Sequence, residues 1–252
     1  MDTCSYFIKE KALFGSYPSE NAVKELECNG VKYFVNLTYE NEDRISQYHT
    51  DNHVINYQIK DRSIPDDLLS FTKFIIHLSE IIKNLKFGDK MYIHCKGGHG
   101  RSGLVVACLI CNLFNYSAYE SLKYTSKCHS NRLVMRDKWR RIGSPQTYVQ
   151  KKFVHQLFRP INYTRMYKGL FSINSTDFKY TVGETIFNSI YEGLSKNIPV
   201  DVLYRSKLEQ NADMRDFLVH TYLKPIVSYD SNNKLSNEIC KYLTSIRTFY
   251  LI

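Results

Sequence analysis

The stretch from residue 90 to residue 114 reads KMYIHCKGGHGRSGLVVACLICNLF, and it constrains the fold more than any other part of the chain. It places a short apolar strand pattern, a glycine-rich loop and an apolar helix pattern in direct succession. Four of the chain's 11 glycines lie between Gly97 and Gly103, a density that indicates backbone with positive φ or in close approach to another group. Because successive loop N–H groups and the start of a helix attract negative charge, this stretch predicts an anion-binding loop.

Strand and helix patterns alternate around this stretch. β-branched and aromatic residues predict strands over 31–37 and 53–59, in addition to the one at 90–94. Helices are expected where apolar residues recur at helical spacing, over 19–30, 67–86, 102–114, 117–128 and 145–158. Pro145 stands at the first position of the last helix, where proline is well tolerated. Strands separated by helices predict the α/β class, with a mainly parallel central sheet flanked by helices.

The pattern changes near residues 158–169, which read FRPINYTRMYKG. The elements before this point already make a unit of ordinary domain size. We therefore expect a first domain over 1–159 and a smaller, mostly helical domain over 160–252. A chain of 252 residues with 43% hydrophobic side chains is large and apolar enough for real cores.

The composition argues against several classes of protein. The first residues, MDTCSYFIKEKA, are charged early and lack the apolar centre of a secretory signal. The longest apolar run, Leu104–Cys111, is too short to cross a bilayer. The seven cysteines are odd in number and scattered, so buried reduced thiols are expected rather than a disulfide framework or a zinc site. We expect a cytoplasmic, metal-free protein.

The formal net charge of +9 is unevenly distributed. Residues 127–152 carry eight lysines and arginines against one acid, Asp137. A solvated helix face is the simplest interpretation of this basic run. An electropositive rim for an anionic substrate is the alternative.

A cysteine opens the glycine-rich loop and an arginine closes it. The nucleotide-binding pattern G-x-x-x-x-G-K-[ST] is absent. Cys95 would lie at the bottom of the anion-binding loop. There the loop N–H groups and the helix start favour a thiolate near neutrality. Arg101 would offer a planar fork to two oxygens of a phosphoryl group. The spacing favours a nucleophile directed at phosphorus.

At these residues the sequence resembles the cysteine-dependent protein tyrosine phosphatase superfamily. Its signature H-C-x-x-G-x-x-R-[ST] is matched by His94, Cys95, Gly98, Arg101 and Ser102. The sequence HCKGGHGRSG is most similar to those of the compact dual-specificity and kinase-associated branches. The resemblance covers about residues 5–158 and implies neither a metal nor another cofactor.

The resemblance implies a general acid on a loop upstream of the cysteine. The segment YQIKDRSIPDD offers three candidates, Asp61, Asp66 and Asp67. Asp61 directly follows the expected strand and matches the family position best. Asp66 and Asp67 stand at a helix start, where an acid is more often a cap.

Further roles are implied by the same resemblance. Ser102 would help the thiolate leave in the second step, although a helix N-cap would look identical. His94 would hold the loop rather than act as a base. Gln146 and Gln150 would orient the hydrolytic water, although two exposed glutamines on a helix would look the same.

The loop itself would bind the phosphoryl group. Lys96 and His99 occupy the positions at which phosphoinositide phosphatases carry extra basic residues, but a solvent-facing lysine is the simpler interpretation of Lys96. The residues expected to bind phosphate are Lys96, Gly97, Gly98, His99, Gly100 and Arg101.

These observations favour a phosphatase that hydrolyses phosphotyrosine in proteins, and phosphoserine or phosphothreonine in addition, through a phosphocysteine intermediate. Phosphoinositides and RNA 5′-phosphates are the alternative substrates. A fold that binds phosphorylated partners without turnover is a third hypothesis, which the joint presence of Cys95, Arg101 and Asp61 disfavours. The expected partner is a phosphorylated protein in the cytoplasm, or in the host cytoplasm if the source is a virus.

The segment 160–252 carries a weaker signal. The stretch KLEQNADMRDFLVHTYLKPIVSYDSNN resembles the end of the NADAR family, which acts on ADP-ribose-like or riboflavin-pathway glycosides. Glu184 and Glu192 are the nearby carboxylates, but neither is placed at that family's catalytic position. An accessory domain is favoured over a second active site.

Overall fold

The computed structural model describes residues 2–43, 45–230 and 232–252. By its internal contacts the chain divides into two compact units, Met1–Phe158 and Arg159–Ile252. Each unit buries its own set of apolar side chains.

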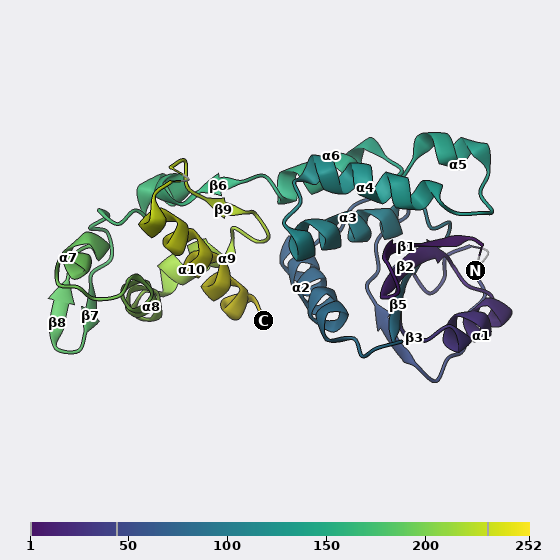
Figure 1. Ribbon diagram of the computed structural model, residues 1–252, viewed down its shortest axis with the longest axis horizontal. Coiled ribbons are helices and arrows are strands. Elements are labelled where there is room, and N and C mark those ends of the chain that lie inside the picture. Colours follow the sequence, from purple (N-terminus) through teal and green to yellow (C-terminus); the bar gives the residue numbers. More distant parts are fainter. Residues whose placement is uncertain (1, 44, 231) are drawn as a thin grey trace. The chain divides into compact units, whose positions relative to one another are not determined.

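A five-stranded sheet forms the centre of the first unit, in the order β1-β2-β5-β3-β4 (Figure 1). Only the β1–β2 pair is antiparallel, and the other three pairs are parallel. The predicted mainly parallel sheet is therefore confirmed. The strands are β1 Cys4–Ile8, β2 Ala12–Ser16, β3 Val31–Asn36, β4 His53–Asn56 and β5 Lys90–Cys95.

Helices cover both faces of this sheet. One face packs on α3, which lies between α2, α4 and α6, and the other face packs on α1. Alternate side chains of each strand point to opposite faces, so Leu13, Phe34 and Tyr92 join the apolar residues of α1 in one cluster. The helices are α1 Glu20–Cys28, α2 Leu68–Asn84, α3 Arg101–Phe114, α4 Ala118–Ser130, α5 Asp137–Ile142 and α6 Tyr148–Leu157.

Most of the predicted elements of the first unit are confirmed, but the predicted start of the last helix is wrong. Pro145 does not begin α6. The helix begins at Tyr148 behind a capping box, in which Thr147 Oγ1 accepts from Gln150 N and Gln150 Oε1 accepts from Thr147 N, each at 3.2 Å. The capping box gives hydrogen-bond partners to the N–H groups of Thr147 and Gln150. A helix that began at Pro145 would leave N–H groups of its first turn to solvent. The short strands β1 and β2 and the short helix α5 were not predicted.

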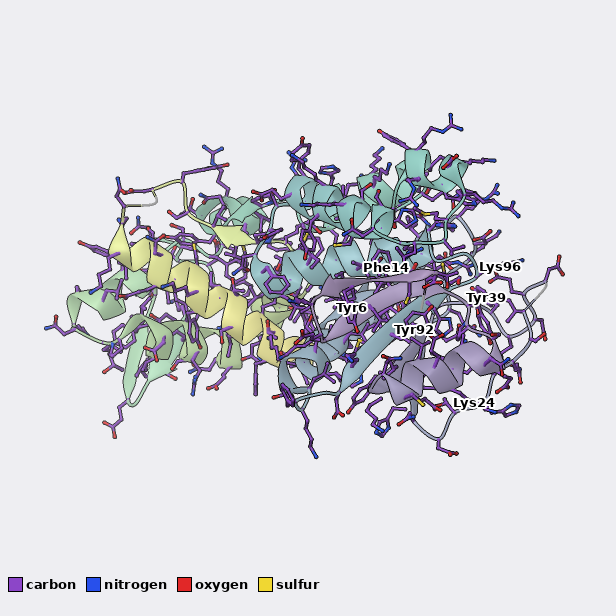
Figure 2. The ribbon with its side chains drawn as sticks, turned by 45° about the vertical axis from the view of Figure 1, so that its right-hand side comes forward. Tyr6, Phe14, Lys24, Tyr39, Tyr92 and Lys96 are labelled. Carbon is purple, nitrogen blue, oxygen red and sulfur yellow. The ribbon has the colours of Figure 1, made fainter. Side chains whose placement is uncertain are left out.

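The parallel strands bring four loops to one edge of the sheet. β3, β4 and β5 all end at this edge, and β2 runs parallel to β5. In sheets of this kind the loops beyond the carboxyl ends of the strands carry the ligand-binding residues. Figure 2 labels Tyr39 and Lys96, which come from the loops after β3 and β5.

The second unit is mostly helical, with two small two-stranded sheets. β6 and β9 pair in parallel, and β7 and β8 form a hairpin. Glu192 Oε2 accepts from Asn188 N at 2.8 Å beside the start of α7, and Glu184 is exposed in the β7–β8 turn. The elements are β6 Ile161–Asn162, η1 Tyr163–Gly169, β7 Tyr180–Val182, β8 Thr185–Phe187, α7 Ile190–Ser195, α8 Val200–Gln210, α9 Ala212–Val219, β9 Ile226–Val227 and α10 Lys234–Leu251.

Candidate active site

The glycine-rich loop connects the end of β5 to the start of α3. Cys95 is the last residue of β5 and Arg101 is the first residue of α3. Gly100 is the N-cap of α3 and offers no side chain to the first N–H groups of the helix. These donors are therefore available to an anion held above the loop.

Two glycines of the stretch are required by close packing against neighbouring protein. Gly98 has φ +72°, and a Cβ atom there would lie 2.6 Å from the backbone N of Ser16, at the end of β2. A Cβ atom on Gly103 would overlap the Oγ atom of Ser144. The sequence predicts glycines for approach to an anion, and the structure adds that the loop is fixed tightly against β2 and residue 144.

Cys95 and Ser102 lie together beneath the loop. The Cys95 side chain is buried, and its Sγ atom is 3.6 Å from Ser102 Oγ. Ser102 is also buried, in the first turn of α3. Its hydroxyl can donate a hydrogen bond to a thiolate at Cys95.

Arg101 is held by a carboxylate that the sequence did not identify. Its Nη1 and Nη2 atoms donate to the two oxygens of Glu42 at 2.6 and 2.7 Å, and Nη1 also donates to Ile59 O at 3.1 Å. Burial acts to lower the pKa of Arg101, but the hydrogen bond to Glu42 and the nearby negative charges outweigh it and raise that pKa. The same hydrogen bond lowers the pKa of Glu42. The pair is therefore ionised at neutral pH.

The other edge of the Arg101 guanidinium, formed by Nε and Nη2, is only partly occupied. Its Nε atom is buried and has no hydrogen-bond partner among the residues that the structure describes. Its Nη2 atom lies 3.1 Å from Asp61 Oδ1. A buried donor without a partner is costly, and Nε with Nη2 forms the planar fork that binds two phosphoryl oxygens. This edge can hold a phosphate while the opposite edge stays on Glu42.

The structure separates the three candidate acids. Asp61 contacts Arg101, and its side chain is 59% exposed. Asp67 is the N-cap of α2, and its Oδ1 atom accepts from Leu69 N at 2.8 Å and Ser70 N at 3.2 Å. Asp66 is exposed just before that cap. Of the three, Asp61 is the one placed beside the loop arginine.

His94 is buried behind the loop and is neutral. Its Nε2 atom is 2.8 Å from the hydroxyl of Tyr48, and its ring packs edge-on against Tyr17. Burial lowers the pKa of His94 to about 3. The Leu37 backbone N–H donates to His94 O, which ties the start of the loop to the end of β3. This geometry suits a structural role.

Lys96 and His99 differ in their surroundings. Lys96 is partly exposed, and its charge contributes to the lowered pKa of Glu42. The His99 Nδ1 atom is 2.8 Å from His129 Nε2, and its ring stacks on Trp139 at 4.8 Å. Burial lowers the pKa of His99 to about 4. The His99 side chain is therefore neutral and engaged with its neighbours, and phosphate binding by His99 stays a prediction.

The two glutamines lie next to the loop. A Cβ atom on Gly100 would come within 3.2 Å of the Gln150 amide and 3.6 Å of Gln146 Cβ. Gln150 is buried, and besides its bond to Thr147 it donates through Nε2 to Ser63 O at 3.0 Å. Gln146 is partly exposed. Gln150 therefore already uses its side chain to connect α6 to the loop after β4, and the water-orienting role of both residues stays a prediction.

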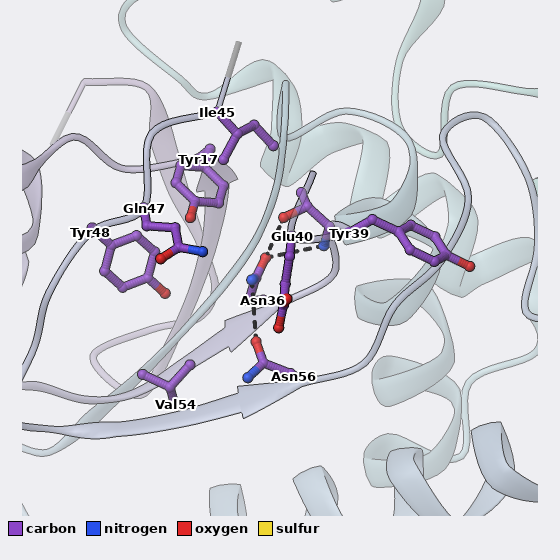
Figure 3. Close-up of a pocket in the computed structure, with 10 residues that line it drawn as sticks. Tyr17, Asn36, Tyr39, Glu40, Ile45, Gln47, Tyr48, Val54 and Asn56 are labelled. Carbon is purple, nitrogen blue, oxygen red and sulfur yellow. Dashed lines mark hydrogen bonds between the residues drawn. The ribbon is translucent and has the colours of Figure 1, made fainter. Parts of the chain in front are cut away.

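A cavity of about 190 Å³ lies at the ends of β3 and β4 (Figure 3). Tyr17 and Tyr48 line it and contact the ring of His94 behind the loop. Asn36 fixes its floor, since it donates to Asn56 Oδ1 at 3.2 Å and accepts from the Thr38 hydroxyl at 2.8 Å. The cavity therefore puts aromatic and amide groups beside the anion loop.

The comparison with known families identifies the first unit. Residues 1–154 match the family described as PTP-SAK, a "Swiss Army Knife" DSP-PTPase phosphatase domain. The chain belongs to this family. The resemblance stated from His94, Cys95, Gly98, Arg101 and Ser102 is thereby confirmed.

Two viral proteins are similar in sequence. "Putative tyrosine phosphatase 067L" of Invertebrate iridescent virus 3 is 40% identical over 160 residues, which cover 63% of this chain and 66% of that protein. "Putative tyrosine phosphatase 197R" of Invertebrate iridescent virus 6 is 40% identical over 167 residues, which cover 62% of this chain and 57% of that protein. The chain thus spans less than two thirds of the length of either relative.

Solved structures of phosphatases are similar at lower identity. Tk-PTP in its active form is 21% identical with a TM-score of 0.48, over 61% of this chain and 97% of that chain. The kinase associated phosphatase with a cysteine-to-serine substitution is 18% identical with a TM-score of 0.47, over 61% of this chain and 91% of that chain.

The structure shows neither a membrane-spanning helix nor a metal-binding cluster within 2–43, 45–230 and 232–252. No helix there is both long and apolar enough to cross a membrane. No group of three or more histidine, cysteine, aspartate or glutamate side chains there is arranged to hold a metal ion.

Proposed function

We propose that this chain is a cysteine-dependent phosphatase that hydrolyses phosphotyrosine in proteins, with phosphoserine and phosphothreonine as further substrates. The observation that carries the proposal is the arrangement around Arg101. Glu42 fixes one edge of its guanidinium, while the buried Nε atom on the other edge, next to the Cys95 loop, has no partner among the described residues. A phosphoryl group would supply that partner.

In the first step, the Cys95 thiolate attacks phosphorus and the bond from phosphorus to the tyrosyl oxygen breaks. Arg101 and the loop N–H groups bind the three equatorial oxygens, on which charge is spread in the transition state. Asp61 gives its proton to the departing oxygen. To do so it leaves its present contact with Arg101 Nη2, which the phosphate then occupies.

In the second step, water attacks phosphorus and the bond from phosphorus to Cys95 Sγ breaks. Asp61, now a carboxylate, takes a proton from that water. The departing thiolate is stabilised by a hydrogen bond from Ser102, whose Oγ atom is 3.6 Å from Sγ. Inorganic phosphate then leaves, with Cys95 again a thiolate and Asp61 again protonated.

A trapped phosphoenzyme tests the proposal. Acid quenching during turnover of a phosphotyrosine peptide should leave one phosphoryl group on Cys95, located by mass spectrometry of the peptide that contains it. Cys95→Ser should bind the peptide without turnover, because serine lacks an accessible anionic form. Cys111→Ser is the matched control. Both cysteines are 3% exposed, but Cys111 lies within α3 and not at the anion-binding loop. Turnover by Cys95→Ser at the level of Cys111→Ser would refute the covalent mechanism.

The same experiment separates the alternative functions. A binding module without turnover would retain phosphopeptide in the unsubstituted protein and form no phosphocysteine. Turnover should be unaffected by EDTA, and inhibition that added metal reverses would point to a metal enzyme. We further propose that the protein acts in the cytoplasm and that residues 160–252 form an accessory domain.

A further inference from the structure

A cavity of about 510 Å³ lies at the edge of the sheet opposite to the Cys95 loop. Two turns bound it, one between β1 and β2 and the other between α2 and β5. Lys90 begins β5 and Cys95 ends it, so the length of that strand, about 17 Å, separates the cavity from the nucleophile. The residues that line the cavity all belong to the first unit. None of them takes part in the candidate active site.

Phe87 protrudes into solvent beside this cavity. Its 106% exposure is the largest of any bulky apolar side chain among the described residues. Asp89 N donates to Lys86 O at 3.1 Å, which closes a tight turn with Phe87 near its tip. Gly88 has φ +89°, a conformation that favours glycine at the third position of a turn. A Cβ atom on Gly30 would overlap Gly88 O, so this turn is packed against the one between α1 and β3, which fixes the backbone that presents the ring.

Four lysines line the same cavity. Lys9 and Lys11 come from the turn between β1 and β2, and Lys86 and Lys90 come from the turn between α2 and β5. None of the four forms an ion pair with a residue that the structure describes. Glu10 is the single acid among the described residues of the lining. The surface therefore keeps a net positive charge around an exposed aromatic ring.

The kind of cation distinguishes between two anionic partners. Interfaces with other proteins are enriched in arginine and depleted in lysine, because the planar guanidinium fork pairs with carboxylates. No arginine is among the described residues that line this cavity. Lysine ammonium groups are point charges, which suit the diffuse negative potential of lipid headgroups. A protruding phenylalanine suits the same partner, since aromatic side chains enter the boundary between headgroups and acyl chains.

We propose that the surface formed by Lys9, Lys11, Lys86, Phe87 and Lys90 docks on an anionic lipid membrane. The four ammonium groups lie among the headgroups, and the Phe87 ring enters the boundary below them. A single apolar anchor gives marginal binding, whereas an anchor combined with a basic patch gives stable binding. This docking does not rest on the proposed phosphatase activity.

Docking in this way directs the Cys95 loop away from the membrane. β2 and β5 run parallel from the docking surface toward that loop. A headgroup in the same membrane therefore cannot reach Cys95, whereas a phosphorylated protein can. In terms of the proposed function, the docked enzyme acts on proteins near the membrane and not on the lipids that hold it.

Sedimentation of the full chain with vesicles tests the docking without any need for turnover. The chain should sediment with vesicles of equal parts phosphatidylserine and phosphatidylcholine, and not with vesicles of phosphatidylcholine alone. Binding should fall as the salt rises from about 0.1 M to about 1 M, since the Debye length falls from about 10 Å to about 3 Å. Phe87→Ala should weaken the affinity by about tenfold, because an apolar ring leaves water on binding. Lys86→Gln should weaken it by about fivefold, the effect of one basic residue near such a membrane.

Matched substitutions outside the surface are the controls. Phe249→Ala removes a phenylalanine that is 71% exposed on α10, and Lys73→Gln removes an exposed lysine of α2. Both should bind as the unsubstituted chain does. Absence of binding to the anionic vesicles overturns the proposal, and so do equal affinities of Phe87→Ala and Phe249→Ala. Binding of soluble polyglutamate that Phe87→Ala loses, in place of vesicle binding, would assign the surface to an acidic protein and overturn the membrane as its partner.

Turnover tests the orientation separately. With saturating anionic vesicles, kcat/KM for a soluble phosphotyrosine peptide should be unchanged, because the edge that carries the Cys95 loop stays open to solvent. A loss of turnover that Phe87→Ala relieves would show that docking covers the loop, which overturns the orientation. A chain that binds the vesicles but hydrolyses no phosphopeptide would refute the proposed function and support the docking alone.

Discussion

The Arg101 guanidinium donates to both carboxylate oxygens of Glu42, at 2.6 and 2.7 Å, across 59 residues of sequence. Glu42 comes from the loop after β3, and Arg101 opens α3 after β5. The pair therefore joins the loops that follow two neighbouring parallel strands. It fixes the orientation of the arginine before any phosphate arrives, which reduces the ordering that binding requires.

Glu42→Gln should weaken both folding and catalysis. The amide keeps the shape but removes the charge, so the free energy of unfolding should fall by about 2 kcal/mol, the order expected for a hydrogen bond between charged groups. The arginine would also be less fixed, and kcat/KM for a phosphotyrosine peptide should fall by about 10–100-fold. Glu40→Gln, at an exposed position two residues away, should do neither. Equal stability and equal kinetics of the two variants would contradict a role for the pair.

The stability difference between the unsubstituted chain and Glu42→Gln should also depend on pH. The folded-state pKa of Glu42 is lowered, mainly by its hydrogen bond from Arg101. Its contribution is therefore fully present above the unfolded-state pKa of about 4.3 and is lost as the pH falls through the lower folded-state value. Urea unfolding of both proteins from pH 7 down to pH 3 measures this, and a difference that stays constant over that range would show that the charge of Glu42 is not the cause.

Ser102→Ala should slow the second chemical step more than the first. The lost hydroxyl is the group that lies 3.6 Å from Cys95 Sγ, and a hydrogen bond to a departing anion contributes about 10–100-fold to a rate. Rapid-quench measurements should show a larger burst of released tyrosine and more phosphocysteine at steady state. Ser121→Ala is the control, because that buried hydroxyl donates to Ala107 O and not to the loop. A uniform slowing without a burst would show that Ser102 does not assist the departing thiolate.

The strand–loop–helix at the site could be predicted because each part is local. Apolar residues at strand and helix spacing flank a cluster of glycines, and the order Cys95, Arg101, Ser102 fixes their places on the loop and the first turn of α3. Asp61 could be placed since it follows a strand that runs parallel to β5. Each of these inferences needs only short-range patterns and the direction of the strands.

Glu42 and Arg132 could not be identified in the same way. Glu42 lies in a polar loop between β3 and β4 that has no periodicity, and nothing in its neighbours distinguishes it from Glu40. In the sequence, Arg132 stands among exposed basic residues. In the fold, its segment lies against β2, and the Arg132 guanidinium packs on Phe14, 4.5 Å from the ring centre. Both arrangements depend on contacts between distant segments. A rule that polar residues gather at the carboxyl ends of parallel strands would have pointed to the Glu42 loop without choosing the residue.

A chain that ends at Arg159 should fold and retain most of its activity toward a small aryl phosphate. The two units have separate cores, and Val154 and Leu157 of α6 are buried within the first. Circular dichroism and kcat/KM for an aryl phosphate measure the two properties against the full chain. Insoluble protein would show that residues 160–252 complete the first core. Release of ADP-ribose or a related sugar by the isolated 160–252 segment would overturn its accessory role.

Asp61→Ala should slow phosphotyrosine hydrolysis by about 10²–10⁴, the usual contribution of a positioned general acid. The carboxyl lies 3.1 Å from Arg101 Nη2, on a loop that could move it over a phosphate on Cys95. The loss should shrink as the leaving group becomes more acidic, because a good leaving group needs little protonation. The basic limb of the pH–rate profile should flatten for the same reason.

Asp67→Ala is the matched control for this assignment. It removes another carboxylate of the same segment, but one that accepts from Leu69 N and Ser70 N and caps α2. Its cost should be about 0.5–2 kcal/mol of stability with no dependence on the leaving group, and Asp66→Ala should show neither effect. If Asp66→Ala or Asp67→Ala shows the leaving-group dependence and Asp61→Ala does not, the proton comes from an acid at the start of α2. The contact between Asp61 and Arg101 would then serve only to hold the arginine in place.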